Sequence, residues 1–370
     1  MKTVLVAGAS GLIGEAAVAQ FAADGWNVIT VSRRAPEQVD GVSVRHLAVD
    51  LRDPAACQAA FGALRDVTHV VYAALYEKPG LYAGWLEADQ METNLSMLRN
   101  LLEPLSAASD LQHVSLLQGA KAYGAHAGHR MPIPARERAP RVQHENFYWL
   151  QEDLLRATAK ARGFTWTIFR PVVVVGAAWG AAMNPLIALG VYAAVRRELG
   201  QPFAYTGGVR HAQELVDPRL LGQAFAWAAD AKAAADETFN VTNGDVFSWV
   251  DTWPALAEAF GAETGPDEPQ RIAEFLPAHA DVWDRIVARE GLRPIGLLQL
   301  LGESHHYADI LLRPGLEVAG PPSLLSTIKI RQAGFAPCFD SEDTLRHWAG
   351  VLAARRIIPG ARAALEAAPA

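Results

Sequence analysis

Tyr148 lies at the centre of the stretch ENFYWLQEDLL, residues 145–155, where a helical pattern begins. A phenol can donate a hydrogen bond or a proton to an oxygen that gains negative charge. A lysine one helical turn later would lower the pKa of the phenol, because side chains four residues apart share a helix face. This chain has Glu152 at that position. A carboxylate near the phenol would raise the phenol's pKa, so the positive charge for such a site must come from another element.

Lys121 is the candidate for that charge. It lies in the segment SLLQGAKAYG, just beyond the apolar strand pattern HVSLL that precedes the Tyr148 helix. Taken alone, Tyr148 also fits an aromatic residue packed in a core, and Lys121 fits a solvated loop lysine. Their joint appearance in consecutive elements favours a catalytic pair, with Tyr148 as hydrogen-bond donor and Lys121 as its electrostatic partner.

The elements that would position this pair alternate between strand and helix. Apolar, β-branched runs such as TVLVAG, NVITVSRR, THVVYAA, HVSLLQG and FTWTIFRPVVVV are separated by helical patterns. This alternation predicts an α/β fold, a Rossmann-like doubly wound parallel sheet. We expect this domain over residues 1–175, joined by a later strand within about 205–245. A smaller, mainly helical substrate lobe is expected from residues 176–204 and 246–370.

The first strand pattern runs into GASGLIG, with glycines at 8, 11 and 14. Glycines at a strand-to-helix turn permit a tight bend and let backbone amides approach a pyrophosphate, and the helix N-terminus adds partial positive charge. In this strand–helix context the turn predicts dinucleotide binding. The spacing G-x-x-G-x-x-G resembles that of the short-chain dehydrogenase/reductase superfamily.

The end of the second strand favours NADPH over NADH. Ser32, Arg33 and Arg34 stand where NAD-binding proteins keep an acidic residue for the adenosine ribose, and two guanidiniums would attract a 2′-phosphate. Solvated arginines at a strand end are the plainer alternative. The expected cofactor contacts are Gly8, Ser10, Gly11, Leu12, Ile13, Gly14, Ser32, Arg33, Arg34, Asp50, Leu51, Ala73, Pro171 and Val173.

Composition excludes several other classes of protein. The net charge is −7 and no run of basic residues is present, which argues against nucleic acid as a partner. Two distant cysteines give no disulfide framework, and the histidine pairs lack ligand spacing, so no metal site is expected. The uncharged stretch 171–195 is interrupted by glycines and Asn184-Pro185, and we expect a buried strand end, a loop and a helix rather than a membrane span. We therefore expect a cytoplasmic protein without membrane association, for which a homodimer is one permitted arrangement.

A more specific resemblance joins these motifs. The segment QGAKAYG, the run NFYWLQED, and later FTWTIFRPVVVVG, GVYAAVRRELGQPFAYTGG and ETFNVTNGDVFSW are similar to the progesterone 5β-reductase/iridoid synthase family. The resemblance covers nearly the whole chain and loosens after about residue 265. It implies that Tyr148 is the catalytic tyrosine and Lys121 its lysine partner. The chain departs from the family at Gln118, Ala122 and Trp149, which concerns the substrate more than the chemistry.

The resemblance implies an NADPH-dependent ene-reductase that acts on a small or medium apolar enone or enal. Hydride would reach the β-carbon, and Tyr148 would donate to the enolate oxygen. Tyr76, Trp179 and Met183 follow strand ends where a ligand site would open, and we expect them to line the substrate, although core packing explains the last two almost as well. The alternatives are a carbonyl reductase or a nucleotide-sugar epimerase of the same fold, and, in another class, a binding protein that senses NADP(H) without turnover.

Overall fold

The structure is a computed structural model that describes residues 2–36 and 44–361. Its contacts divide the chain into two units. The first comprises Met1–Val172, Pro218–Thr242 and Ser323–Cys338, and the second comprises Val173–Asp217, Asn243–Pro322 and Phe339–Ala370. Residues 323–338, which the sequence analysis assigned to the substrate lobe, therefore contribute to the first unit.

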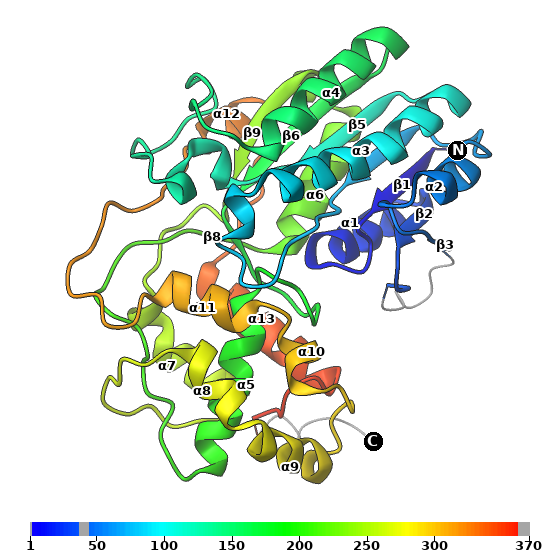
Figure 1. The fold of residues 1–370 in the computed structure, drawn as a ribbon. Helices are drawn as coiled ribbons and strands as arrows, with labels where there is room; N and C mark the ends of the chain where they lie inside the picture. Colours follow the sequence, from blue (N-terminus) through cyan, green and yellow to red (C-terminus); the bar gives the residue numbers. More distant parts are fainter. Residues whose placement is uncertain (1, 37–43, 362–370) are drawn as a thin grey trace. The chain divides into compact units, whose positions relative to one another are not determined.

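A seven-stranded, fully parallel sheet forms the centre of the first unit (Figure 1). Its strand order is β3-β2-β1-β4-β5-β6-β9. The β-branched runs form strands because both faces of a parallel sheet are covered, and β1 and β4 are buried at every residue. The strands are β1 Thr3–Ala7, β2 Asn27–Ser32, β3 Arg45–Ala48, β4 His69–Tyr72, β5 His113–Leu117, β6 Thr165–Pro171 and β9 Glu237–Val241.

Helices cover both faces of this sheet. On one face α1 and α6 pack together, and on the other α2, α3 and α4 pack in series. Local signals set several of their starts: Asp53 caps α2 through the backbone N–H groups of Ala55 and Ala56, with Pro54 in the first turn. The predicted Rossmann-like doubly wound sheet is confirmed. The helices are α1 Leu12–Ala23, α2 Pro54–Phe61, α3 Ala88–Ala108, α4 Phe147–Arg162, α6 Pro218–Asp230 and α12 Ile328–Gln332, with 3-10 turns η1 Gly84–Leu86, η2 Ala120–Tyr123, η3 Ala125–Ala127 and η4 Lys232–Ala234.

The second unit is mainly helical and has a hydrophobic core of its own around α5, which is buried along nearly its whole length. Two short parallel strands, β7 Val173–Val174 and β8 Leu215–Val216, accompany the helices. The helices are α5 Pro185–Glu198, α7 Trp249–Phe260, α8 Ile272–Ala278, α9 Ala280–Glu290, α10 Leu297–Leu301, α11 Ser304–Leu312 and α13 Ser341–Ala354. Within residues 2–36 and 44–361, no helix is both long enough and apolar enough to cross a membrane.

Candidate active site

The glycine turn between β1 and α1 has no room for side chains at two positions. Gly8 has a φ of +82°, and a Cβ atom there would lie 2.7 Å from the carbonyl of Ala73. A Cβ atom on Gly14 would lie 2.1 Å from the Gly8 oxygen. Helix α1 then begins at Leu12 without a side-chain cap, so its first N–H groups remain available to an anion. The turn therefore fits the pyrophosphate of a dinucleotide, and Ala73, another expected cofactor contact, lies directly against it.

The adenosine end of the expected site carries the predicted polar residues. Arg33 and Arg34 follow the end of β2 and are exposed, while the Ser32 hydroxyl donates to the Arg34 carbonyl oxygen at 2.5 Å. Asp50 accepts hydrogen bonds from the Arg52 guanidinium, including one of 2.6 Å from Nη2, and this partner lowers the Asp50 pKa to about 2. Leu51 is buried beside it. This end of the sheet thus offers exposed guanidiniums, and the Asp50 carboxylate is already paired with Arg52.

Tyr148 lies at the carboxyl ends of two central strands. Its hydroxyl oxygen lies 3.1 Å, and the Pro171 carbonyl oxygen 3.5 Å, from the position that a Cβ atom on Gly119 would occupy. Gly119 follows β5 and Pro171 ends β6, so the phenol reaches the edge where ligands bind in open α/β sheets. The tyrosine is only 5% exposed and packs against Phe147 with ring centroids 4.6 Å apart. The packing holds the hydroxyl in one place.

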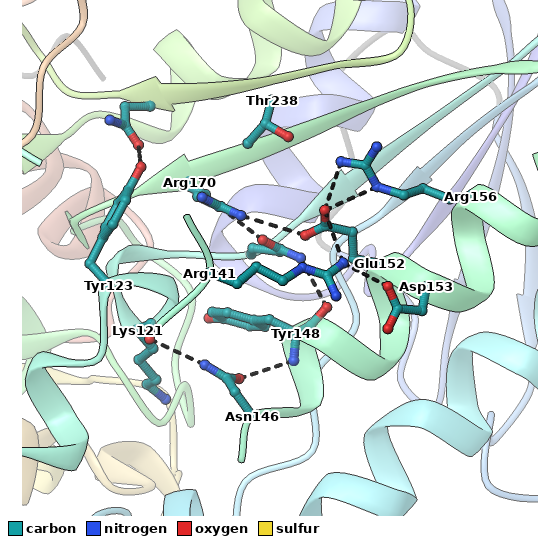
Figure 2. A network of polar contacts seen from close by, with 12 residues as sticks. Lys121, Tyr123, Arg141, Asn146, Tyr148, Glu152, Asp153, Arg156, Arg170 and Thr238 are labelled. Carbon is teal, nitrogen blue, oxygen red and sulfur yellow. Dashed lines mark hydrogen bonds and ion pairs between the residues drawn. The ribbon is translucent and has the colours of Figure 1, made fainter. Parts of the chain in front are cut away.

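Asn146 connects the tyrosine to the lysine (Figure 2). Its Oδ1 accepts the Tyr148 backbone N–H at 3.0 Å and so caps α4, while its Nδ2 donates to the Lys121 carbonyl oxygen at 3.1 Å. The side chain of this one residue therefore fixes the start of the tyrosine helix against the turn η2 that carries the lysine.

Lys121 has a buried ion-pair partner. Its Nζ lies 3.2 Å from Oε1 of Glu77 and 3.7 Å from the centroid of the Trp85 ring. Burial lowers the pKa of the lysine to about 8, and the Glu77 carboxylate opposes that change. The site thus contains a cation that can lose its proton not far above neutral pH.

Glu152, one turn after Tyr148, binds a set of arginines. Its Oε1 lies 2.7 Å from Nη2 of Arg156 and 3.2 Å from Nη2 of Arg141, and its Oε2 lies 3.5 Å from Nη2 of Arg170 (Figure 2). Although burial favours the neutral carboxyl, the three guanidiniums outweigh it and lower the Glu152 pKa. The charge of the Glu152 carboxylate is therefore neutralised by arginines, although the residue stands one turn after Tyr148.

Gln118 and Arg170 extend this network to the tyrosine backbone. The Arg170 Nε donates to Oε1 of Gln118 at 3.0 Å, and the Gln118 Nε2 donates to the carbonyl oxygen of Tyr148 at 3.1 Å. Glu152 therefore acts on the position of Tyr148 through β6 and the residue after β5, as well as along its own helix.

The expected substrate residues lie in different units. Tyr76, in the first unit, is held by Asn94: its N–H donates to Oδ1 of Asn94 at 2.9 Å, and its carbonyl oxygen accepts from Nδ2 at 2.9 Å. Trp179 and Met183 belong to the second unit and are half-buried, and Trp179 packs against the core of that unit. Val173 also belongs to that unit, in β7. Their roles in binding stay predictions.

Glu77, Trp85, Asn146 and Arg170 were not found by sequence reasoning. Asn146 could have been, because Asn directly before an apolar helix start is a capping signal. Glu77 and Trp85 lie in the loop and turn after β4, where no spacing rule connects them to Lys121. Among the residues that the structure describes, no group of three His, Cys, Asp or Glu side chains is placed to hold a metal ion.

The chain is similar to several known proteins. Residues 4–242 match the NAD dependent epimerase/dehydratase family. An (S)-8-oxocitronellyl enol synthase of Nepeta cataria is 29% identical over 377 residues, covering 97% of this chain and 93% of that protein. A 3-oxo-Delta(4,5)-steroid 5-beta-reductase of Arabidopsis thaliana has the same identity and coverage.

Solved structures show the same fold. The UDP-glucose 4-epimerase of Thermus thermophilus, solved in complex with NAD, has a TM-score of 0.62 and 20% identity, covering 95% of this chain and 98% of that one. The resemblance inferred from the motifs is confirmed by the relatives and the fold together. The chain belongs to the NAD dependent epimerase/dehydratase family, among the extended short-chain dehydrogenases/reductases, as an oxidoreductase of the progesterone 5β-reductase/iridoid synthase-like group.

Proposed function

We propose that this protein is an NADPH-dependent ene-reductase that reduces the C=C bond of apolar enones or enals. The observation that carries the proposal is the position of Tyr148: its hydroxyl lies at the carboxyl ends of β5 and β6, and the residue one turn later is a carboxylate bound by arginines instead of a lysine. Two relatives, an enol synthase and a 3-oxo-steroid 5-beta-reductase, bear names that agree with this chemistry.

The proposed mechanism assigns one task to each residue. NADPH, held at the glycine turn and the start of α1, would supply a hydride for the carbon that is β to the carbonyl group. Negative charge then develops on the carbonyl oxygen, where Tyr148 donates a hydrogen bond. A proton from water at the α-carbon completes the reduction and returns the carbonyl group. A phenol kept neutral suits this role, because the oxygen requires a donor rather than a base. Lys121 adds positive potential at the same edge of the sheet, where burial makes a charge act more strongly than it would in water.

The cofactor preference rests on the end of β2. Arg33 and Arg34 are exposed there, and each can form charge-assisted hydrogen bonds with a 2′-phosphate. Replacing both by alanine should raise the KM for NADPH by about 10–100-fold and leave the KM for NADH nearly unchanged, since a hydrogen bond to a charged group contributes roughly 1.5–3 kcal/mol. Steady-state kinetics with the two cofactors measures this, and equal effects on both would contradict the 2′-phosphate assignment.

The reaction itself is tested with NADPH and a matched panel of cyclic enones, open-chain enals and saturated ketones, with products identified by mass spectrometry. We expect reduction of C=C bonds only. Tyr148→Phe should lower kcat by about 10²–10³-fold, the usual effect of removing one donor to a developing oxyanion. Tyr82→Phe, which removes the hydroxyl of an exposed tyrosine and leaves Tyr148 unchanged, is the control.

The other outcomes distinguish the remaining functions. Turnover of saturated ketones alone would make the protein a carbonyl reductase, since the same tyrosine can protonate an alkoxide. Tight NADP binding without turnover of any substrate would favour the sensing protein.

A further inference from the structure

Glu77 is a buried carboxylate in the loop that follows β4, and its side chain is only 5% exposed. Removing a carboxylate from water is costly unless charges and hydrogen-bond donors replace the water. The burial of the Glu77 carboxylate must therefore be compensated by neighbouring charges and hydrogen-bond donors.

Both oxygens of Glu77 are used. Oε1 faces the Lys121 ammonium at 3.2 Å, while Oε2 accepts from the Trp85 indole N–H at 2.9 Å and from the Gln90 amide at 2.8 Å. The donors come from three different elements: η2, η1 and α3. The carboxylate is thus held in a fixed orientation while one oxygen points at the lysine.

The support around Gln90 is itself rigid. Gln90 is 1% exposed, and its Oε1 accepts the backbone N–H of Lys78 at 3.0 Å. A Cβ atom on Gly84 would lie 2.2 Å from the same Oε1. The turn η1 can therefore approach Gln90 only because position 84 has no side chain, and this close approach places Trp85 beside Glu77.

Lys121 is held from two sides by this arrangement. Oε1 of Glu77 lies 3.2 Å from the Lys121 Nζ. The same Nζ lies over the Trp85 ring, 3.7 Å from its centroid, which is a cation–π geometry. Both partners favour the charged lysine, whereas burial favours the neutral one. The charge of Lys121 therefore depends on Glu77.

We propose, on the premise that Lys121 serves the reductase reaction proposed above, that Glu77 is a positioning residue of this site. It holds the Lys121 ammonium against the Trp85 ring and keeps that ammonium charged. Glu77 acts through the lysine and needs no contact with the substrate or the cofactor.

The other titratable groups near Lys121 do not take over this role. His126, in η3, faces the lysine, and its pKa falls to about 4 through burial, the lysine charge and the neighbouring His144 and His129. It is therefore neutral at neutral pH. From the start of α4, Asn146 and Tyr148 contribute an amide and a phenol. Glu77 supplies the negative charge.

The first test measures the lysine directly. The chain has six lysines, so selective ¹³C,¹⁵N-lysine labelling gives a simple NMR spectrum in which Lys121 is assigned with Lys121→Arg. We expect the Lys121 ε-methylene signal to titrate near pH 8 in the wild type. In Glu77→Gln it should titrate about one pH unit or more lower, as expected when an opposite charge within hydrogen-bond range is removed.

The second test follows kcat/KM for an enone against pH. The alkaline limb of the profile should move to lower pH together with the Lys121 pKa. Glu77→Gln should therefore lose about fivefold in kcat/KM at pH 8 and little at pH 6, because this is the ratio of charged lysine fractions for a change of one pKa unit. Glu77→Asp, which keeps the charge, should restore the profile. Glu87→Gln is the matched control, because Glu87 is exposed and pairs with Lys78; it should move neither measurement.

An unshifted Lys121 titration in Glu77→Gln would overturn the proposal, and so would an equal loss of activity at every pH. If Glu77→Gln does not fold, Glu77→Asp decides through the same titration. We expect its Lys121 signal to titrate near pH 8, as in the wild type, and a titration one pH unit or more lower despite the retained carboxylate would overturn the proposal. Absence of enone turnover in the wild type would defeat the proposed reaction, while the NMR titration would still decide whether Glu77 controls the lysine.

Discussion

Glu77 and Glu152 both have buried carboxylate groups, and they differ in their partners. Glu77 faces one lysine, a tryptophan N–H and an amide, and the pKa of that lysine is lowered to about 8. Glu152 faces three guanidiniums, a type of group that keeps its proton in proteins. The first group can change its charge near neutral pH, whereas the second cannot.

The Glu77–Lys121 pair can change its charge, whereas the Glu152–arginine group is suited to holding the structure. Lys121 is a cation whose charge depends on its surroundings, because burial favours the neutral amine and the Glu77 carboxylate favours the charged one. A group that only has to hold strands and a helix in place is better built from arginines, whose planar donors fix geometry without titrating. The chain therefore keeps a carboxylate at the position where a lysine would otherwise follow Tyr148, and it carries its lysine on η2.

The largest expected effect is on stability and comes from the Glu152 group. Glu152→Gln leaves Arg170, whose side chain is 7% exposed, without a charged partner, and should lower the free energy of unfolding by about 3–5 kcal/mol. Urea unfolding followed by circular dichroism measures this. Asp153→Asn is the matched control, because Asp153 is 63% exposed and its ion pair with Arg141 should contribute less than about 1 kcal/mol. Equal effects of the two substitutions would remove the distinction between the two carboxylates.

The same variant makes a prediction for pH. Since the Glu152 pKa is lower in the folded chain than its ordinary value of 4.5, the ionised carboxylate contributes its full stability above about pH 4.5. That contribution is lost as the pH falls through the lowered pKa. The difference in unfolding free energy between the wild type and Glu152→Gln should therefore be constant from pH 7 to pH 5 and shrink at lower pH. A difference that shrinks instead on the alkaline side would contradict the assignment.

The smallest expected effect comes from the Glu77 group. Trp85→Phe keeps an aromatic ring but removes the N–H donor to Oε2, which retains the Gln90 amide. Because one hydrogen bond to the Glu77 carboxylate is lost, the free energy of unfolding should fall by about 1.5–3 kcal/mol. Trp26→Phe is a suitable comparison, since the exposed Lys2 lies over that ring at 4.9 Å. A loss as large as that of Glu152→Gln would place Glu77 among the structural supports.

Much of the fold could be predicted from the sequence because its signals are local. The period of the apolar runs, the glycines of the first turn and the Asp53-Pro54 start each act within a few residues. Tyr148 and Lys121 were predicted as a pair from the order of their motifs, with the lysine just beyond the strand that precedes the tyrosine helix, and from the family resemblance. The charged contacts around that pair could not be predicted from the sequence. Glu77 and Lys121 are 44 residues apart in the chain, and Glu152 and Arg170 are 18 residues apart. Such contacts depend on how a loop and a strand are placed in three dimensions.

Asn146 determines at what stage the Tyr148 helix and the Lys121 turn are fixed relative to each other. One amide group caps the tyrosine helix and holds the carbonyl of the lysine, so the two backbones are fixed to each other when the chain folds. The conformational entropy of bringing the phenol and the lysine turn together is therefore lost once, during folding, and not again each time a ligand binds.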